Sequence, residues 1–254
     1  MSEDLKGGSV EYRTEGKVGR IIFGHPQSNS LPGAVLRKLA KTIEEAGKDS
    51  TRVLILESLG DRAFCAGASF DELVAIEDFD TGKRFFMGFA LVINAMRKCP
   101  KFIIAKVQGK AVGGGVGLLS AADYTYGTEF SSVKLSELAL GIGPFVVGPA
   151  VERKSSTSVF SQMSIDFDWY APEWALDSGL YQAIFTSKEV LDEETDKLAS
   201  RLSEQSPEAM AELKRVLWRG TEDWDELLEQ RAEISGRLVL SEFTKDYIKQ
   251  FKSK

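Results

Sequence analysis

Short apolar runs alternate with helical periodicities along the first two-thirds of this 254-residue chain. Runs at 18–23, 53–58 and 103–107 are rich in Val, Ile and Leu, which is typical of buried strands. From Leu31 to Ala46 the apolar residues recur at the spacing of one helix face. A glycine-rich turn, a short helix through Ala122 and a strand at 124–126 follow. Strands that alternate with helices predict an α/β fold.

From about Lys188 onward the pattern is helical. Charged residues separate apolar residues at helical spacings: Leu191, Leu198, Leu202, Leu213, Val216, Leu217, Leu227, Leu228, Ile234 and Leu238. Ser206 and Pro207 fit the cap and first turn of one such helix. We therefore predict a core at 1–190 and a helical region at 191–254 that acts as a lid or in oligomerisation. Its amphipathic helices cover either the chain's own core or, in part, a subunit interface.

Composition and charge narrow the class of protein. The chain is 43% hydrophobic, and none of its apolar runs approaches the roughly 20 residues of a membrane span. Its first residues have neither the basic start nor the apolar stretch of a secretory signal, so we expect a cytoplasmic protein. Cys65 and Cys99 lack metal-ligand spacing, so we expect reduced packing residues and no metal site. The net charge of −6, with Lys and Arg scattered among acids, argues against nucleic-acid binding.

Three segments have the composition of a binding site. The first, Arg62–Leu73, is a turn of small residues between a buried strand and a helix, where backbone N–H groups can approach an anionic oxygen. The second, Val107–Leu119, contains three consecutive glycines, Gly113–Gly115, which indicate positive φ angles or close backbone approach. It matches neither the P-loop, because Ala111 follows Lys110, nor the dinucleotide fingerprint, because Leu118 stands at the third glycine.

The third segment, Ser136–Phe145, places one carboxylate, Glu137, among apolar and small residues. A carboxylate in such surroundings tends to have a raised pKa and can act as a general acid or base near neutral pH. Taken alone, each segment also fits a structural role: the first and second as turns, and Glu137 as a helix cap or salt-bridge partner.

In this order and spacing, the segments resemble the crotonase superfamily, also called the enoyl-CoA hydratase/isomerase family. The chain has counterparts of five family patterns: Pro26–Leu31, Phe64–Ala68, Gly113–Gly115, Ala122–Asp123 and Glu137–Gly141. Ala175 and Gly179–Leu180 continue the match, so the resemblance covers nearly the whole chain. The resemblance implies a spiral of ββα units with a C-terminal helical region, and a homotrimer or homohexamer built on those helices.

The resemblance also implies roles for individual residues. The N–H groups of Ala68 and Gly114 would form an oxyanion hole for the oxygen of an acyl-coenzyme A thioester. The turn at Ala66, Gly67 and Ser69 would meet the adenine of a bent coenzyme A, which is part of the substrate, so no separate cofactor is implied. Preorganised donors of this kind contribute about 3 to 4 kcal/mol each in a dry site.

Three departures from the family pattern limit the activity that can be carried over. Hydratases of the family use two glutamates, and Gly117 stands where one of them is expected. The remaining acid, Glu137, matches the single base of Δ3,Δ2-enoyl-CoA isomerases. Ser69 replaces the usual aspartate, and the stretch 164–173 lacks the usual basic and threonine-containing pattern. Three hypotheses stay open: an isomerase, a hydratase in which Asp71, Tyr124 or a water replaces the second acid, and a non-catalytic acyl-CoA-binding subunit.

Several other polar residues have simpler interpretations. The single histidine, His25, precedes Pro26, and we expect an exposed turn residue rather than a ligand of a coenzyme phosphate. Asp71 and Glu72 fit a solvated helix start. We expect Asp123 to satisfy backbone groups at a helix end, Tyr124 and Tyr126 to be strand residues, and Phe145 with Val146–Val147 to narrow the acyl pocket. Lys245 is a candidate for coenzyme contact near the end of the chain.

Overall fold

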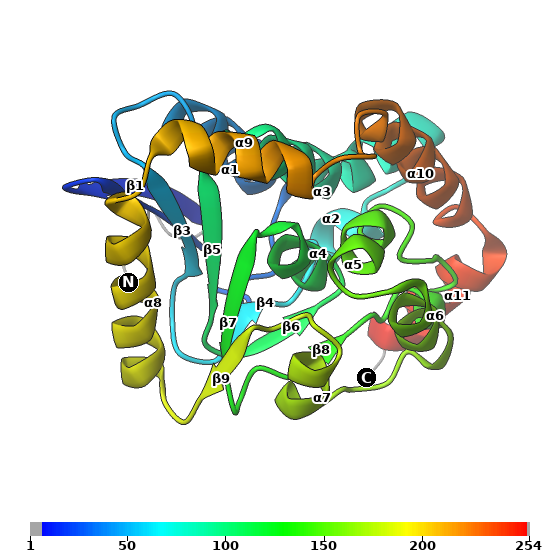
Figure 1. Cartoon of the computed structure of the whole chain (residues 1–254). Coiled ribbons are helices and arrows are strands. Elements are labelled where there is room, and N and C mark those ends of the chain that lie inside the picture. The colour runs from blue at the N-terminus through cyan, green and yellow to red at the C-terminus, as the bar shows by residue number, and fades with distance from the viewer. Residues whose placement is uncertain (1–6, 253–254) are drawn as a thin grey trace.

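The structure, a computed structural model, describes residues 7–252 and contains two β-sheets (Figure 1). The larger sheet has the strand order β1-β2-β3-β5-β7-β9 and the smaller one the order β4-β6-β8. Only β1 and β2 pair antiparallel; the other neighbours are parallel. The strands are β1 (Ser9–Glu15), β2 (Val18–Gly24), β3 (Val53–Ser58), β4 (Ala63–Cys65), β5 (Phe102–Val107), β6 (Lys110–Val112), β7 (Tyr124–Thr128), β8 (Val133–Lys134) and β9 (Ala183–Phe185).

The chain builds the two sheets in alternation, which gives a spiral. Three times in succession, the chain adds one strand to the larger sheet and the next to the smaller sheet, as β3 then β4, β5 then β6, and β7 then β8. A helical segment follows each such pair of strands before the chain returns to the larger sheet. The predicted α/β fold, a spiral of ββα units, is therefore confirmed.

Helices surround the sheets and fill the space between them (Figure 1). The helices are α1 (Gly33–Ala46), α2 (Phe70–Val74), α3 (Phe79–Lys98), α4 (Gly114–Ala121), α5 (Gly148–Lys154), α6 (Thr157–Asp166), α7 (Pro172–Asp177), α8 (Lys188–Ser203), α9 (Pro207–Leu217), α10 (Trp224–Leu238) and α11 (Glu242–Lys252), with a 3₁₀ turn at Leu138–Leu140. The predicted start of α9 is confirmed, because the Ser206 hydroxyl accepts a hydrogen bond from Ala209 N.

The central strand β3 explains why the larger sheet is covered on both faces. All six of its residues are buried, and successive side chains point to opposite faces. Leu54 and Leu56 belong to the main core, whereas Val53 and Ile55 pack with residues of α8 on the other face. A continuous apolar run is the sequence signature of such a doubly covered strand.

The C-terminal helices α10 and α11 fold back onto α3 and onto the turn after Glu137. Helix α10 packs along α3, and two glycines meet at the crossing: a Cβ atom added at Gly82 would lie 3.0 Å from the carbonyl oxygen of Gly236. Helix α11 packs against the turn after Glu137, where a Cβ atom at Gly141 would lie 2.5 Å from the Phe243 ring. Residues from both halves of the sequence therefore lie side by side around Gly82 and Gly141.

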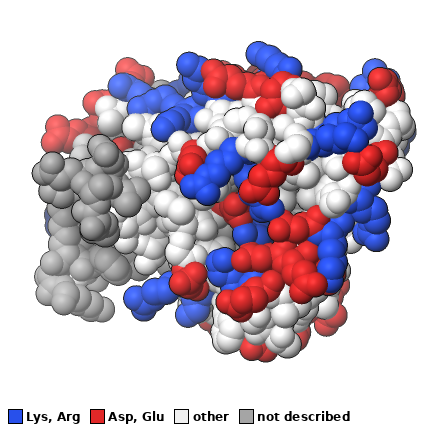
Figure 2. Space-filling view, turned by 90° about the vertical axis from the view of Figure 1, so that its left-hand side faces the viewer, with Lys and Arg blue, Asp and Glu red and all other residues white. Residues whose placement is uncertain are grey.

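Among the described residues, no helix has the length and apolar composition needed to cross a lipid bilayer. On the face shown in Figure 2, Lys and Arg side chains are interspersed with Asp and Glu side chains. Ion pairs join the larger sheet to α8, including Arg20 with Asp196 and Lys106 with Asp192. This face therefore presents no continuous basic stripe.

Candidate active site

The three predicted segments meet around one cavity of about 370 Å³. Its lining includes Ala66–Ala68 from the turn after β4, Gly113 and Gly114 at the start of α4, and Glu137 after β8. Side chains of α3, the loop 143–147, α10 and α11 complete the wall. Segments separated by more than a hundred residues thus share one site.

The turn after β4 is held so that the N–H group of Ala68 remains available. Ala66 N donates to Ser28 O at 3.2 Å, and Ser69 N donates to Leu31 O at 3.0 Å. The carbonyl oxygen of Ala68 accepts a hydrogen bond from the Ser30 hydroxyl at 2.8 Å. Within residues 7–252, no hydrogen bond uses the N–H of Ala68. The loop 28–31 therefore fixes the turn through the groups on either side of this donor.

The second available donor opens helix α4. Gly113 precedes the helix with φ of +52°, a conformation that favours glycine, and its N–H donates to Lys134 O at 2.8 Å. Gly114 is the first helical residue, where an N–H has no intrahelical acceptor. No hydrogen bond within the described part of the chain uses this N–H. A Cβ atom at Gly67, whose φ is +92°, would lie 3.8 Å from Gly114 N, so the two turns are neighbours.

Large side chains would not fit beside these donors. A Cβ atom at Gly114 would lie 2.2 Å from the Phe89 ring, and one at Gly115 would lie 2.4 Å from Cys65 O. The glycine triplet is therefore required by close packing as well as by the positive φ angle at Gly113.

The carboxylate of Glu137 faces this pair of turns. A Cβ atom at Gly113 would lie only 2.9 Å from Glu137 Oε1. Glu137 Oε2 is buried and has no hydrogen-bond partner in the described structure. Burial raises the pKa of Glu137 to about 7. The predicted rise in pKa is thus present. Glu137 stands at the N-cap position of the turn Leu138–Leu140, but within the described residues its side chain makes neither a cap hydrogen bond nor a salt bridge.

Gly117 marks where a second acid would be expected, and other side chains fill that space. A Cβ atom at Gly117 would lie 2.5 Å from Val147 Cγ1 and 3.6 Å from Ile93 Cδ1. Gly117 is fully enclosed in α4. A glutamate cannot be accommodated here unless Val147 moves.

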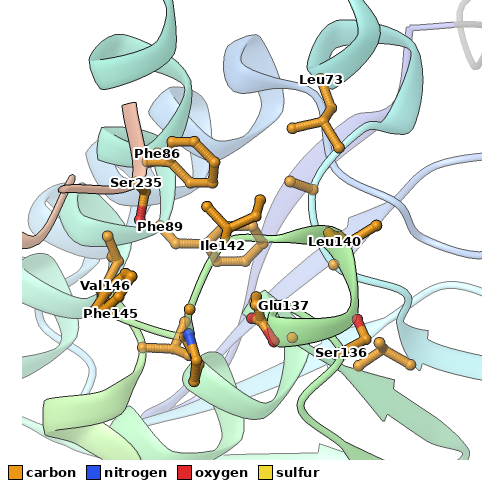
Figure 3. Close-up of a pocket in the computed structure, with 18 of the residues that line it drawn as sticks. Leu73, Phe86, Phe89, Ser136, Glu137, Leu140, Ile142, Phe145, Val146 and Ser235 are labelled. Atoms are coloured by element: carbon orange, nitrogen blue, oxygen red, sulfur yellow. The ribbon is translucent and has the colours of Figure 1, made fainter. Parts of the chain in front are cut away.

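The part of the cavity away from the two N–H donors is an apolar chamber (Figure 3). Four apolar side chains lie to the left of or above Glu137 in this view: Phe86 and Phe89 from α3, and Phe145 and Val146 from the loop 143–147. Ser235 from α10 lies among them. Phe145, Val146 and Val147, which were predicted to form an apolar wall, all line the cavity.

The sequence pattern did not identify several lining residues: Phe85, Phe86, Phe89, Ser235 and Tyr247. The aromatic residues at 85, 86 and 89 have the spacing of one helix face, but that signal predicts burial and does not distinguish a core from a pocket. Ser235 and Tyr247 have no local signal, because their place in the wall depends on how α10 and α11 fold back.

Other predicted residues lie outside this cavity. Ser69 caps α2, with its hydroxyl accepting from Glu72 N, and it is not part of the cavity wall. The carboxylate of Asp71 accepts from the Gln27 side chain, and Glu72 accepts from Gly33 N. Lys245 is exposed on α11.

Asp123 is structural, as predicted, with a larger role than a helix end. Its carboxylate accepts from Ile103 N and from the Trp218 indole, and it pairs with the buried Lys214 at 2.8 Å. Tyr124 and Tyr126 lie on β7, as predicted, and their rings pack edge to face. Neither tyrosine lines the cavity.

His25 is only partly exposed and lines a second cavity of about 440 Å³. Asp61 and Arg62 line it too, as do Ser28 and Asn29. Burial lowers the pKa of His25. Asn29, at φ of +57°, donates to Leu59 O and Ala63 O and accepts from His25 N, which holds the loop beside β4. His25 is therefore part of a concave surface and not a fully exposed turn.

Within residues 7–252, no group of three or more His, Cys, Asp or Glu residues is placed to hold a metal ion. Cys65 and Cys99 are buried free thiols, as expected of packing residues.

Comparisons with known proteins show similarity over most of the chain. A probable enoyl-CoA hydratase of Bacillus subtilis (strain 168) is 26% identical over 240 residues, which cover 93% of each chain. A carnitinyl-CoA dehydratase of Proteus mirabilis (strain HI4320) is 28% identical over 85% of this chain and 82% of that protein. A peroxisomal Delta(3,5)-Delta(2,4)-dienoyl-CoA isomerase of Arabidopsis thaliana is 24% identical over 84% of this chain and 81% of its own.

The fold is also similar to solved structures. The crystal structure of an enoyl-CoA hydratase from Bacillus halodurans superposes with a TM-score of 0.88 at 21% identity, covering 95% of this chain and 99% of the other. The family model for enoyl-CoA hydratase/isomerase matches residues 13–253. The chain belongs to the enoyl-CoA hydratase/isomerase family.

Proposed function

We propose that this protein is an enoyl-CoA isomerase that moves a double bond from the 3-position to the 2-position of an acyl-CoA thioester. The observation that supports this choice most directly is the packing of Val147 into the space beside Gly117. That packing leaves Glu137 as the one carboxylate in the cavity wall formed by the described residues. A double-bond shift needs one base, whereas addition of water in this family uses two acids.

The reaction begins with proton removal at the α-carbon of the substrate. The Glu137 carboxylate takes a proton from C2, and the electron pair moves through the C3–C4 double bond system and the thioester to give a dienolate. Negative charge then lies on the thioester oxygen, where the N–H groups of Ala68 and Gly114 donate to it. A pKa of about 7 suits a group that must take up and release a proton near neutral pH.

The reaction ends when the same carboxyl group returns the proton. Protonated Glu137 gives its proton to C4, the electrons return from the oxygen, and the double bond now lies between C2 and C3. Atoms and charge balance without a water, an oxidant or a second acid. The apolar chamber around Phe86 and Phe145 excludes water from the dienolate during this transfer.

Coenzyme A would bind along the turn at Ala66 and Gly67, as the family resemblance implies. The second cavity lies next to that turn, because Ser28, which accepts from Ala66 N, lines it. Arg62 supplies a positive charge there, and the His25 ring offers a flat surface. We propose that this cavity receives the adenosine phosphate end of the coenzyme.

Incubation of the pure protein with 3-enoyl-CoA substrates of several chain lengths tests the proposal, with the absorbance of the conjugated 2-enoyl product as the readout. Isomerisation that exceeds hydration of the matching 2-enoyl-CoA supports it. Lack of conversion at every chain length contradicts it.

A hydratase is the second candidate, and the names of relatives such as the Bacillus subtilis protein favour it. The two side chains considered as replacement acids do not support it, because Asp71 and Tyr124 are not in the cavity wall. Hydration of crotonyl-CoA that survives Glu137→Gln would select this candidate. Tight binding of acyl-CoA without deuterium exchange at C2 would instead select a non-catalytic binding subunit.

We also propose that the protein forms a trimer or a dimer of trimers, as the family resemblance implies. The exposed side of α9 carries Leu213, Val216 and Leu217, each more than half exposed in the single chain. Light scattering on the pure protein measures the assembly, and a monomeric mass would contradict the proposal.

A further inference from the structure

One hydroxyl group lies at the apolar end of the acyl chamber. Ser235 belongs to α10, is 1% exposed and lines the cavity. In Figure 3 its side chain points into the same space as Phe86, Phe145 and Val146, on the far side of the chamber from Ser136. A hydroxyl in such surroundings lacks the water that normally satisfies it.

The place of Ser235 is fixed by the close approach of two helices. The next residue, Gly236, packs against α3 so tightly that a Cβ atom there would lie 2.7 Å from Lys83 N. Lys83 also pairs with Glu229 at 2.7 Å and with Glu233 at 2.8 Å, both earlier on α10. Backbone contact and ion pairs therefore hold this part of α10 against α3, and Ser235 cannot turn away with the helix.

The hydrogen bonding of Ser235 within the protein is weak. Its hydroxyl donates to the Arg231 carbonyl one turn earlier at 3.3 Å, which is long for an O–H donor. It accepts no hydrogen bond within the described residues. The hydroxyl can donate to a ligand keto oxygen in place of this long contact, or accept from a ligand hydroxyl. Each good hydrogen bond of this kind typically stabilises the complex by about 1 kcal/mol or more.

We propose that Ser235 selects acyl groups that carry an oxygen, as a keto or hydroxyl group, on the part of the chain remote from the thioester. The inference rests on the proposed function, since it assumes that the acyl group of a CoA thioester fills this chamber. Ser235 is a specificity residue and takes no part in proton transfer. The Ser235 hydroxyl lies among apolar side chains and so favours an acyl group with an oxygen at this point, because an acyl group without the oxygen leaves the hydroxyl unsatisfied.

Calorimetric titration with saturated acyl-CoA thioesters tests this directly, because they bind without turnover. Straight chains of about six to eight carbons are compared with the same chains carrying a keto group next to the terminal carbon, so that the oxygen is remote from the thioester and samples successive depths of the chamber. At the length that reaches Ser235, the keto thioester binds about tenfold tighter than its parent. In Ser235→Ala this preference is lost, and the parent thioester binds at least as tightly as it does to the unaltered protein, because no hydroxyl is left unsatisfied.

Ser164→Ala is a matched control. Ser164 also donates to a carbonyl one turn earlier, at 2.7 Å to Phe160 O, but does not line the cavity. The preference must survive this change. Equal binding of keto and parent thioesters at every length, or a preference that persists in Ser235→Ala, overturns the inference and leaves the proposed function intact. Absence of binding by every thioester contradicts both.

Discussion

The two sides of the cavity are built in different ways. On one side, the turns at Gly67–Ala68 and Gly113–Gly114 present backbone N–H groups, and a Cβ atom at Gly113 or Gly114 would meet Glu137 or Phe89. On the other side, the chamber owes its shape to side chains from α3, the loop 143–147 and α10. In the proposed mechanism, the first side stabilises an oxyanion with any acyl group, whereas the second determines which acyl group fits and which reaction the enolate undergoes.

This difference predicts which changes abolish the chemistry and which redirect it. Changes at the backbone donors or at Glu137 reduce the rate for every substrate. Changes in the chamber alter specificity or reaction type. Substitutions and pH titrations test that division, from the largest expected effect to the smallest.

Glu137→Gln removes the base and leaves the shape of the site nearly unchanged. Isomerisation of 3-enoyl-CoA falls by about a thousandfold, within the range usual for a positioned general base. Binding of a saturated acyl-CoA changes little, because the oxyanion donors remain. The two measurements are product absorbance and calorimetric titration. Retention of more than about a tenth of the activity would remove Glu137 from the mechanism.

Gly114→Ala tests the backbone side of the cavity. The new methyl group would lie 2.2 Å from the Phe89 ring, so the start of α4 must move and its N–H leaves the position of the oxyanion. We expect a loss of about a hundredfold in kcat, similar to the loss of one oxyanion donor. Gly47→Ala is the control, since Gly47 has φ of −61° and a Cβ atom there would make only ordinary contacts at 3.4 Å. Equal activity of the two variants would contradict the role of Gly114.

Gly117→Glu tests whether Val147 prevents a second acid. The Cβ atom would lie 2.5 Å from Val147 Cγ1, so the single change lowers the free energy of unfolding by about 1–3 kcal/mol through overpacking. The double variant Gly117→Glu with Val147→Gly regains part of that stability and hydrates crotonyl-CoA faster than the unaltered protein. Chemical denaturation and hydration assays measure the two effects. A stable single variant would show that packing at Val147 is not the obstacle.

The smallest expected effect is the change in kcat/KM between neighbouring pH values. Glu137 must be ionised to accept a proton, so kcat/KM rises about tenfold per pH unit toward its pKa of about 7 and is level above it. Stability changes in the opposite direction. The folded-state pKa is raised above the ordinary value of 4.5, so the folded protein binds more protons than the unfolded chain between these values. The free energy of unfolding therefore falls as pH rises through this window.

Glu137→Gln should remove that change in stability. Relative to the unaltered protein, the variant gains up to about 3 kcal/mol above pH 7 and nothing below about pH 4.5. Denaturation at several pH values measures the difference. A constant difference across this range would show that the carboxyl group is not destabilised by burial.

The sequence pattern alone determined the α/β class and the positions of the small-residue turns, and the spiral arrangement followed from the family resemblance. Buried strands such as Val53–Ser58 appear as continuous apolar runs, and glycine triplets mark where backbones meet, so both are properties of local sequence. The isolated acid at Glu137 was visible for the same reason. The edge strand Ser9–Glu15 was missed because most of its residues are polar and partly or fully exposed, so its pairing with β2 leaves little apolar pattern.

Only the tertiary structure decided the chamber. Ser235 and Tyr247 lie about one hundred residues beyond Glu137 and reach the cavity because α10 and α11 return to it. The contact between Gly82 and Gly236 that places Ser235 joins helices with no relation in local pattern. Gly117 could be recognised from the sequence as a missing acid, but its consequence depends on Val147, a side chain from another segment. Local periodicity determines elements and turns, whereas the space between elements depends on how distant segments pack.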